Sequence, residues 1–128
     1  MPERGSAAGF RGLKVYQRAY QLAMEIFRIT KRFPPAERYS LTDQIRRTSR
    51  SVAANIAEGY RKRRYVNVFV LKLTDSDGEA AETQVWLDFL RDCGYISAEQ
   101  RNELVTGYEE VGRMLGGMIE RPERFCPP

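Results

Sequence analysis

Residues 13–33 read LKVYQRAYQLAMEIFRITKRF, and this stretch decides the fold class. Its apolar side chains recur alternately four and three residues apart, which is the spacing of one face of an α-helix. Pro34 and Pro35 end the helix, because proline lacks an amide hydrogen and disfavours helix in the residue before it. We therefore predict one amphipathic helix. Its apolar face consists of Val15, Ala19, Leu22, Ile26, Ile29 and Phe33.

The middle of the chain predicts two further helices. One begins after Ser40, a candidate N-cap, and ends at Gly59, because glycine is common where helices stop. The next covers residues 65–93 and is long by globular standards. Its central residues, 74–79, include no large apolar side chain. A kink, a close crossing at Gly78 or buried polar groups would each explain that gap.

A fourth helix and two flanking segments complete the predicted domain. Ser97 and Gln100 have the spacing of a capping box, which opens the last helix. No stretch alternates like a β-strand, so we predict an all-α protein, an antiparallel up-down-up-down four-helix bundle over residues 13–121. We expect residues 1–12 to be a flexible N-terminal arm and residues 122–128 to be a loose tail.

The composition narrows the function classes. The chain has 128 residues, 42% of them hydrophobic, with no histidine and two cysteines, Cys93 and Cys126. The lack of histidine excludes His-based triads and His-ligated zinc, and two cysteines make no disulfide framework. We expect no enzymatic activity, no metal and no cofactor, and a core position for Cys93. No window suits a membrane span or a signal segment, so we expect a cytoplasmic protein without membrane contact.

The charge is divided unevenly along the chain. Residues 1–74 contain 16 Lys and Arg against 5 Asp and Glu, whereas residues 75–128 contain 5 against 12. The first part is therefore +11 and the second −7. Either basic and acidic helices neutralise each other, within a subunit or between subunits, or a basic face is kept for phosphates. The sequence leaves both interpretations open.

A basic run after the second helix is the best candidate for nucleic-acid binding. Residues 61–64 read RKRR and lie between Tyr60 and Tyr65. Clustered cations attract phosphates, and exposed aromatic rings stack on unpaired bases. The alternative is a solvated loop, but the isoelectric point near 9.3 favours binding. The candidate nucleic-acid-binding residues are Arg61, Lys62, Arg63 and Arg64, with Lys14 and Arg18 on the first helix and Arg47 and Arg50 on the second.

Charged residues on the second and third helices have two interpretations. Arg46, Arg47 and Arg50 could clamp a phosphate, but we expect at least one of them to contact Glu79 or Glu82, because buried charge needs a partner. The carboxylates could also bind Mg²⁺ or Mn²⁺ in a metal-dependent nucleotide hydrolase, although a polar network is favoured. The predicted structural network comprises Arg46, Asn55, Glu58, Glu79 and Glu82.

Five aromatic side chains widen the apolar faces of the first and third helices. Four short helices cannot hide this much apolar surface among themselves, so we predict a homo-oligomer. The five residues are Tyr16, Tyr20, Phe27, Trp86 and Phe89.

Short motifs follow one another at a characteristic spacing. They are LKVY at 13–16, FP at 33–34, ERY at 37–39, QIRR at 44–47, NIAEG at 55–59, ETQ at 82–84, GYI at 94–96 and GRML at 112–115. In this order they resemble a bacterial four-helix-bundle family that is often encoded in intervening sequences of large-subunit rRNA genes. The resemblance covers residues 13–119, and the chain departs from the common pattern at 65–67 and 74–79.

The resemblance implies a left-handed bundle that assembles as a homopentameric ring. It also implies distant kinship to the accessory variability determinant of diversity-generating retroelements, a basic pentameric barrel that binds a reverse transcriptase and nucleic acid. We therefore expect a non-enzymatic oligomer whose basic surface binds RNA or DNA, as an accessory of a reverse transcriptase or an rRNA-related system. The alternative is a protein-interaction scaffold without nucleic-acid binding.

Overall fold

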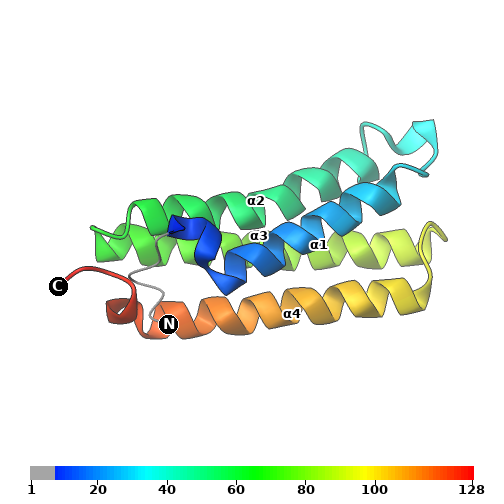
Figure 1. Ribbon diagram of the computed structural model, residues 1–128. Helices are drawn as coiled ribbons and strands as arrows, with labels where there is room; N and C mark the ends of the chain where they lie inside the picture. The colour runs from blue at the N-terminus through cyan, green and yellow to red at the C-terminus, as the bar shows by residue number, and fades with distance from the viewer. Residues whose placement is uncertain (1–7) are drawn as a thin grey trace.

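The computed structural model describes residues 8–128, which form four long α-helices (Figure 1). This part of the chain contains no β-strand, which confirms the predicted all-α class with four helices. None of its helices is long and apolar enough to cross a bilayer. The long helices are α1 (Lys14–Thr30), α2 (Leu41–Arg61), α3 (Val66–Asp92) and α4 (Ala98–Glu120). Short 3-10 helices flank them as η2 (Gly9–Gly12), η3 (Pro35–Glu37) and η4 (Pro122–Arg124).

The helices lie side by side, and successive connections fall at alternate ends of the molecule (Figure 1). The α1–α2 and α3–α4 connections lie at one end, and the α2–α3 connection lies at the other end, near the C-terminus. The α2 and α3 helices pack most extensively, whereas α1 and α4 touch least among the neighbouring pairs. Because a helix rises about 1.5 Å per residue, the two ends of α2 are about 30 Å apart.

The predicted apolar face of α1 is the face that is buried. Val15, Ala19, Leu22 and Ile26 are each at most 2% exposed. The other three helices add buried side chains to the same cluster, so one continuous core runs between all four. Packing of these periodic faces is what holds the bundle together, because isolated helices of this length are marginal in water.

The polar middle of α3 packs through small hydroxyl groups. Ser76 is fully buried and its Oγ donates to the carbonyl of Val52 on α2 at 2.8 Å. Thr83 is also fully buried and donates to Oγ1 of Thr48 at 2.9 Å. Gly78, by contrast, faces open space. Of the three explanations for this segment, the structure therefore supports buried polar groups, whose short side chains bring α2 and α3 close together.

Helix ends follow some of the sequence signals and depart from others. Ser97 and Gln100 form the predicted capping box at the start of α4, with both hydrogen bonds at 3.0 Å. Gly94 follows α3 with a φ of +79°, which suits glycine. The predicted stop at Gly59 is wrong, because α2 continues for two more residues. A Cβ there would lie 3.1 Å from the Cβ of Lys72, so this glycine lets α3 approach α2.

The beginning of the described chain is more ordered than predicted. The expected flexible arm covers residues 1–12, of which 1–7 lie outside the described residues. Within it, Gly9–Gly12 forms η2, and Phe10 packs against the core. The Phe10 ring meets Tyr16 edge-on at a centroid distance of 5.1 Å. Residues 9–12 therefore form a defined element that packs against the bundle.

The C-terminal segment also departs from the prediction. Phe125 and Cys126 are only 6% and 2% exposed. The Phe125 ring lies 6.1 Å from that of Phe69 on α3, between centroids. A loose tail is therefore wrong for these residues, because an aromatic ring beside the open end of the core gains from burial. Cys93, which we predicted to be buried, is exposed.

Candidate nucleic-acid interface

The basic run lies at the connection between α2 and α3. The side chains of Arg61, Lys62 and Arg64 are exposed. The guanidinium carbon of Arg64 lies 5.8 Å from the ring centroid of Tyr65, which is 61% exposed. Within residues 8–128, none of these three cations forms an ion pair. They can therefore contact phosphates without first breaking an ion pair with a carboxylate of the described chain.

Tyr60 and Arg63 lie elsewhere than predicted. Tyr60 is 2% exposed and part of the core, so its ring cannot stack on a base. Arg63 is half-buried, and its Nη1 donates to the carbonyl of Tyr60 at 2.9 Å. Its guanidinium carbon lies 3.9 Å from the centroid of the Tyr60 ring. The predicted exposure of Arg63 is therefore wrong, because this side chain covers the last turn of α2.

The two candidate binding residues on α1 also differ in their surroundings. Lys14 is exposed in the first turn. Arg18 instead forms an ion pair with Glu110 on α4, with Nε and Oε1 2.7 Å apart. Arg18 thus joins the least closely packed pair of neighbouring helices.

A second group of cations lies at the opposite end of α2, beside the α1–α2 connection. We call it the arginine cavity, a hollow of about 470 Å³. The predicted residues Arg47 and Arg50 are both exposed there. Arg46, which we considered with them as a phosphate clamp, also lines the hollow. Sequence reasoning missed the remaining members, which come from the turn before α2 and from its first turn. The lining consists of Arg38, Tyr39, Thr42, Asp43, Arg46, Arg47 and Arg50.

Phe27 on α1 positions several of these cations. Its ring centroid lies 4.8 Å from the guanidinium carbon of Arg46 and 5.9 Å from that of Arg50. Lys31 Nζ lies 4.8 Å from the same centroid. Arg46 is fixed further, because its Nε donates to Oγ1 of Thr30 at 2.7 Å. A ring face attracts cations without neutralising them, so the positive charge stays available.

The predicted contact between an α2 arginine and Glu79 or Glu82 is wrong. Arg47 donates to Oε1 of Gln44 on its own helix at 2.7 Å, and Arg46 and Arg50 face Phe27 as described. Glu82 is exposed and accepts from Nε1 of Trp86 at 3.3 Å. The physical reason is that a neutral hydroxyl and a ring suffice for arginines that remain partly in water.

The remaining residues of the predicted network make separate contacts. Asn55 Nδ2 donates to the carbonyl of Ser51 at 2.9 Å within α2. Glu58 pairs with Lys72 across the α2–α3 contact, with Oε2 and Nζ 3.0 Å apart. In the part of the chain that the structure describes, no group of three or more His, Cys, Asp or Glu side chains could hold a metal ion.

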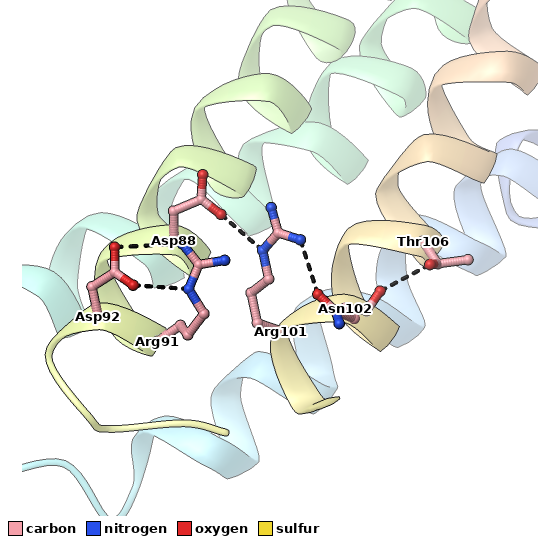
Figure 2. Close-up of polar contacts among 6 residues, drawn as sticks. All are labelled: Asp88, Arg91, Asp92, Arg101, Asn102 and Thr106. Atoms are coloured by element: carbon pink, nitrogen blue, oxygen red, sulfur yellow. Dashed lines mark hydrogen bonds and ion pairs between the residues drawn. The ribbon is translucent and has the colours of Figure 1, made fainter. Parts of the chain in front are cut away.

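Arginines at the α3–α4 corner are paired with carboxylates instead (Figure 2). Arg101 Nε and Asp88 Oδ1 lie 2.8 Å apart, and Arg101 also donates to Oδ1 of Asn102 at 2.9 Å. Arg91 and Asp92 form a second pair at 2.9 Å. The Arg91–Asp92 hydrogen bond raises the pKa of the guanidinium and lowers that of the carboxyl. These arginines are thus engaged within the chain.

A hydrogen bond between the two neighbouring turns withdraws one carboxylate from the arginine cavity. Tyr95 donates from Oη to Oε2 of Glu37 at 2.7 Å. This contact lowers the pKa of Glu37 and raises the pKa of Tyr95. Glu37 directly precedes Arg38 in the chain but forms no ion pair with it in the described structure.

The charge asymmetry of the sequence is not neutralised by ion pairs within the described chain. Across residues 8–128, only Arg18–Glu110 joins a cation of the first 74 residues to a carboxylate beyond them. The interpretation that basic and acidic helices compensate each other inside one subunit is therefore disfavoured. Compensation between subunits and binding of phosphates both stay open.

A profile of the 23S rRNA-intervening sequence protein family matches residues 11–117 of the chain. The chain belongs to this family. This family match confirms the resemblance to the rRNA intervening-sequence family that the short motifs indicated. A crystal structure at 1.70 Å resolution, of a protein of unknown function from the S23 ribosomal protein family of Bacteroides thetaiotaomicron VPI-5482, is similar with a TM-score of 0.74. The two chains are 26% identical over 83% of this chain and 95% of that one. A search of curated proteins gives no significant match.

Proposed function

We propose that the protein is a non-enzymatic, antiparallel four-helix bundle that self-associates and binds RNA or DNA through the basic α1–α2 hairpin. The observation that supports this function best is the set of cations on α2 that form no ion pair within the described chain. Guanidinium groups without a carboxylate partner are suited to phosphate oxygens. The family name associates its members with 23S rRNA intervening sequences, which makes RNA the first ligand to test.

Self-association is supported first by an apolar ridge on α3. Leu71, Val85 and Phe89 are 58%, 48% and 51% exposed. Their spacing places them on the side of α3 opposite the buried residues. Val85 and Phe89 lie one helical turn apart, and exposed apolar side chains that adjoin in this way mark an interaction surface.

An apolar groove between α1 and α2 could receive that ridge. The groove has a volume of about 400 Å³ and is apolar except for Arg50. The α2 side of the groove consists of small side chains, because Ala53, Ala54 and Ala57 lie there. They leave room for another helix to approach closely. The groove belongs to the basic hairpin, and Val85 and Phe89 of the ridge belong to the acidic part of the chain, so charge also favours their contact between copies.

In this proposal α3 of one copy packs into the α1–α2 groove of the next. Such a head-to-tail contact uses two different surfaces, so it closes into a ring or continues as a filament. The family resemblance favours a ring of five. Each ring would repeat the basic hairpin, and several weak phosphate contacts would add up through multivalency. A reverse transcriptase is the protein partner that the resemblance to the retroelement determinant suggests.

Salt-dependent binding tests the nucleic-acid function. The Arg61→Ser, Lys62→Ser, Arg64→Ser variant should still fold, since exposed substitutions cost little, and Arg63 is left in place because it covers the end of α2. Its affinity for RNA should fall, and its dependence of log Kd on log salt should flatten by about 2 for a single strand, given a slope of about 0.7 per phosphate contact. Fluorescence anisotropy between 50 and about 300 mM salt measures both.

The matched control removes three cations from the acidic half, at Arg113, Arg121 and Arg124, which are also exposed. Its binding should equal that of the parent. If the parent binds no RNA or DNA at low salt, the nucleic-acid proposal is withdrawn and the scaffold alternative replaces it.

Light scattering tests the assembly. The parent should run as an oligomer at micromolar concentration, and Val85→Ser with Phe89→Ser should yield a folded species of lower mass. A monomeric parent would overturn the proposed ring.

A further inference from the structure

The first turn of α2 contains a buried hydroxyl group that nothing in the described chain satisfies. Thr42 is only 8% exposed, and its Oγ1 is buried without a hydrogen-bond partner. Thr42 also lines the arginine cavity. Buried polar atoms are nearly always paired, since leaving one unpaired costs free energy. Because Thr42 belongs to the cavity wall, a ligand with acceptor atoms that enters the hollow beside it would satisfy this hydroxyl.

The helix start adds positive potential to the same place. Ser40 occupies the N-cap position of α2, but its side chain caps no amide of the first turn. The Leu41 amide donates to Oε1 of Glu37 at 3.5 Å, and the same carboxylate accepts the hydrogen bond of Tyr95. The start of a 21-residue helix therefore faces the cavity without a side-chain cap from Ser40. Helix N-termini attract phosphate through their free amides and the helix dipole.

The arginines around the hollow are fixed in place but not neutralised. Arg46 is held by Thr30 and by Phe27, and Arg47 by the amide oxygen of Gln44. Asp43 supplies the only carboxylate of the lining, against four guanidinium groups. This excess of positive charge in fixed geometry suits a phosphate group, which accepts paired hydrogen bonds from guanidinium.

An exposed aromatic ring stands at the rim. Tyr39 is 83% exposed, more than any other large hydrophobic side chain in the described chain. The guanidinium carbon of Arg38 lies 5.3 Å from its ring centroid, so one face of the ring has a cation near it. A base can stack on the other face, and stacking of this kind requires a base that is not already paired in a duplex.

We propose that the arginine cavity binds the phosphate of an unpaired nucleotide whose base stacks on Tyr39. This inference rests on the proposed nucleic-acid function and deepens it, because it assigns single-stranded ends or unpaired nucleotides to this end of α2. The basic run, about 30 Å away along α2, contacts phosphates of either single or double strands. Free nucleoside monophosphate has the same chemistry, so the experiment includes it.

The test compares a 5′-phosphorylated single-stranded pentauridylate with a blunt RNA duplex, using the full chain and fluorescence anisotropy. Tyr39→Ala should weaken single-strand binding about tenfold and leave duplex binding unchanged. Tyr39→Phe is the matched control, since it keeps the exposed ring beside Arg38 and removes only the hydroxyl group. It should change single-strand binding less than twofold.

Thr42 supplies a readout that a purely structural role would not give. Thr42→Val removes the unpaired hydroxyl, so it should raise the melting temperature while weakening the single strand several-fold. Thr42→Ser keeps the hydroxyl and should bind like the parent. If Thr42→Val raises the melting temperature but leaves binding unchanged, the hydroxyl does not contact the ligand and the inference is overturned.

Competition with small ligands distinguishes recognition of a nucleotide from binding of any phosphate ion. Uridine 5′-monophosphate should displace the labelled strand at lower concentration than either inorganic phosphate or uridine, because only the nucleotide offers both groups. Equal displacement by inorganic phosphate would indicate an anion site without base recognition and contradict the role of Tyr39.

The two proposals fail in different ways. If duplex and single strand both bind through Arg61, Lys62 and Arg64 while Tyr39→Ala and Thr42→Val change nothing, the proposed function stands and this inference is wrong. If the parent binds neither nucleic acid, both are wrong.

Discussion

The α1–α2 and α3–α4 turns lie at the same end of the bundle and treat arginine in opposite ways (Figure 1). At the α3–α4 turn, Arg91 and Arg101 each hold a carboxylate within 3 Å (Figure 2). At the α1–α2 turn, Arg46 and Arg50 face the ring of Phe27 and form no ion pair among the described residues. Whether an arginine is paired with a carboxylate or faces an aromatic ring matters more than its exposure. The first kind is structural, and the second kind can bind a ligand.

The difference follows from what each partner does to the guanidinium group. A carboxylate neutralises the charge and occupies the N–H donors. An aromatic face restricts the side chain but leaves the in-plane donors free for an anion. The first turn is therefore suited to holding α3 and α4 together, and the second to recognition.

The largest expected effect is on RNA affinity when the arginines of each turn are replaced by uncharged side chains. Arg38→Gln, Arg47→Gln and Arg50→Gln together should weaken RNA binding about 100-fold, or about 2.7 kcal/mol, because three phosphate contacts are lost. Arg91→Gln, Arg101→Gln and Arg121→Gln remove the same charge from paired positions and should weaken it less than about threefold. Anisotropy titrations at fixed salt measure both, with light scattering to confirm equal mass. Equal losses in the two variants would show that net charge alone matters.

The next effect concerns the ring beneath the unpaired arginines. Phe27→Ala should lower the free energy of unfolding by about 2 kcal/mol, below the range for fully buried phenylalanines, because this ring is half-buried. It should also weaken RNA binding, since Arg46 and Arg50 lose the face that orients them. Urea denaturation gives the stability. Phe27→Leu keeps most of the apolar volume but no ring, so a normal affinity in this variant would contradict the orienting role.

A smaller effect is expected on the free energy of unfolding, which should depend on one arginine more than on the other. Arg101→Ala should cost about 0.5–1 kcal/mol, because its pair with Asp88 is partly shielded and joins α3 to α4. Arg47→Ala should cost less than about 0.3 kcal/mol, since it contacts only Gln44 on its own helix. A double-mutant cycle with Asp88→Ala checks that the first loss belongs to the pair. High salt should reduce the first loss and leave the second unchanged.

Much of the fold could be predicted from the sequence, because buried faces leave a period. The stripe from Val15 to Ile26 and the capping box of Ser97 and Gln100 both appear in the structure as expected. Signals of single residues were less reliable. Gly59 reads as a helix stop, yet it lies inside α2 because the Cβ of Lys72 packs against it. Only the tertiary contact tells these two uses of glycine apart.

The candidate site was predicted only in part, for a related reason. The exposed cations of the RKRR run are local in sequence and could be recognised. Thr42 and Tyr39 give no such signal, because a lone threonine and a lone tyrosine are common, and the sequence does not show which side chains of residues 38–50 share one hollow. Arg63 illustrates the opposite error, since membership of a basic run says nothing about whether a side chain covers a helix end.

The smallest expected effect concerns the hydrogen bond from Tyr95 to Glu37, which joins the two turns. The pKa of Glu37 is lowered in the folded protein, first by this bond, so the folded state binds fewer protons than the unfolded state around pH 4. The stabilisation is therefore complete above the ordinary pKa of 4.5 and is lost as the pH falls through the lower folded value. The pKa of Tyr95 is raised above 10.0, so the stabilisation is also lost as the pH rises beyond that region.

Tyr95→Phe should accordingly be less stable than the parent between about pH 5 and pH 9, and the two should converge near pH 3. Urea denaturation across this range measures the difference, and Tyr39→Phe, which removes a hydroxyl from the most exposed tyrosine, should show none. A constant difference at every pH would mean that the Tyr95 hydroxyl acts independently of the charge on Glu37, because Tyr95→Phe keeps the ring that packs against Phe33 at 5.2 Å. In that case the carboxylate would be free to face the arginine cavity, and the contrast between the two turns would narrow.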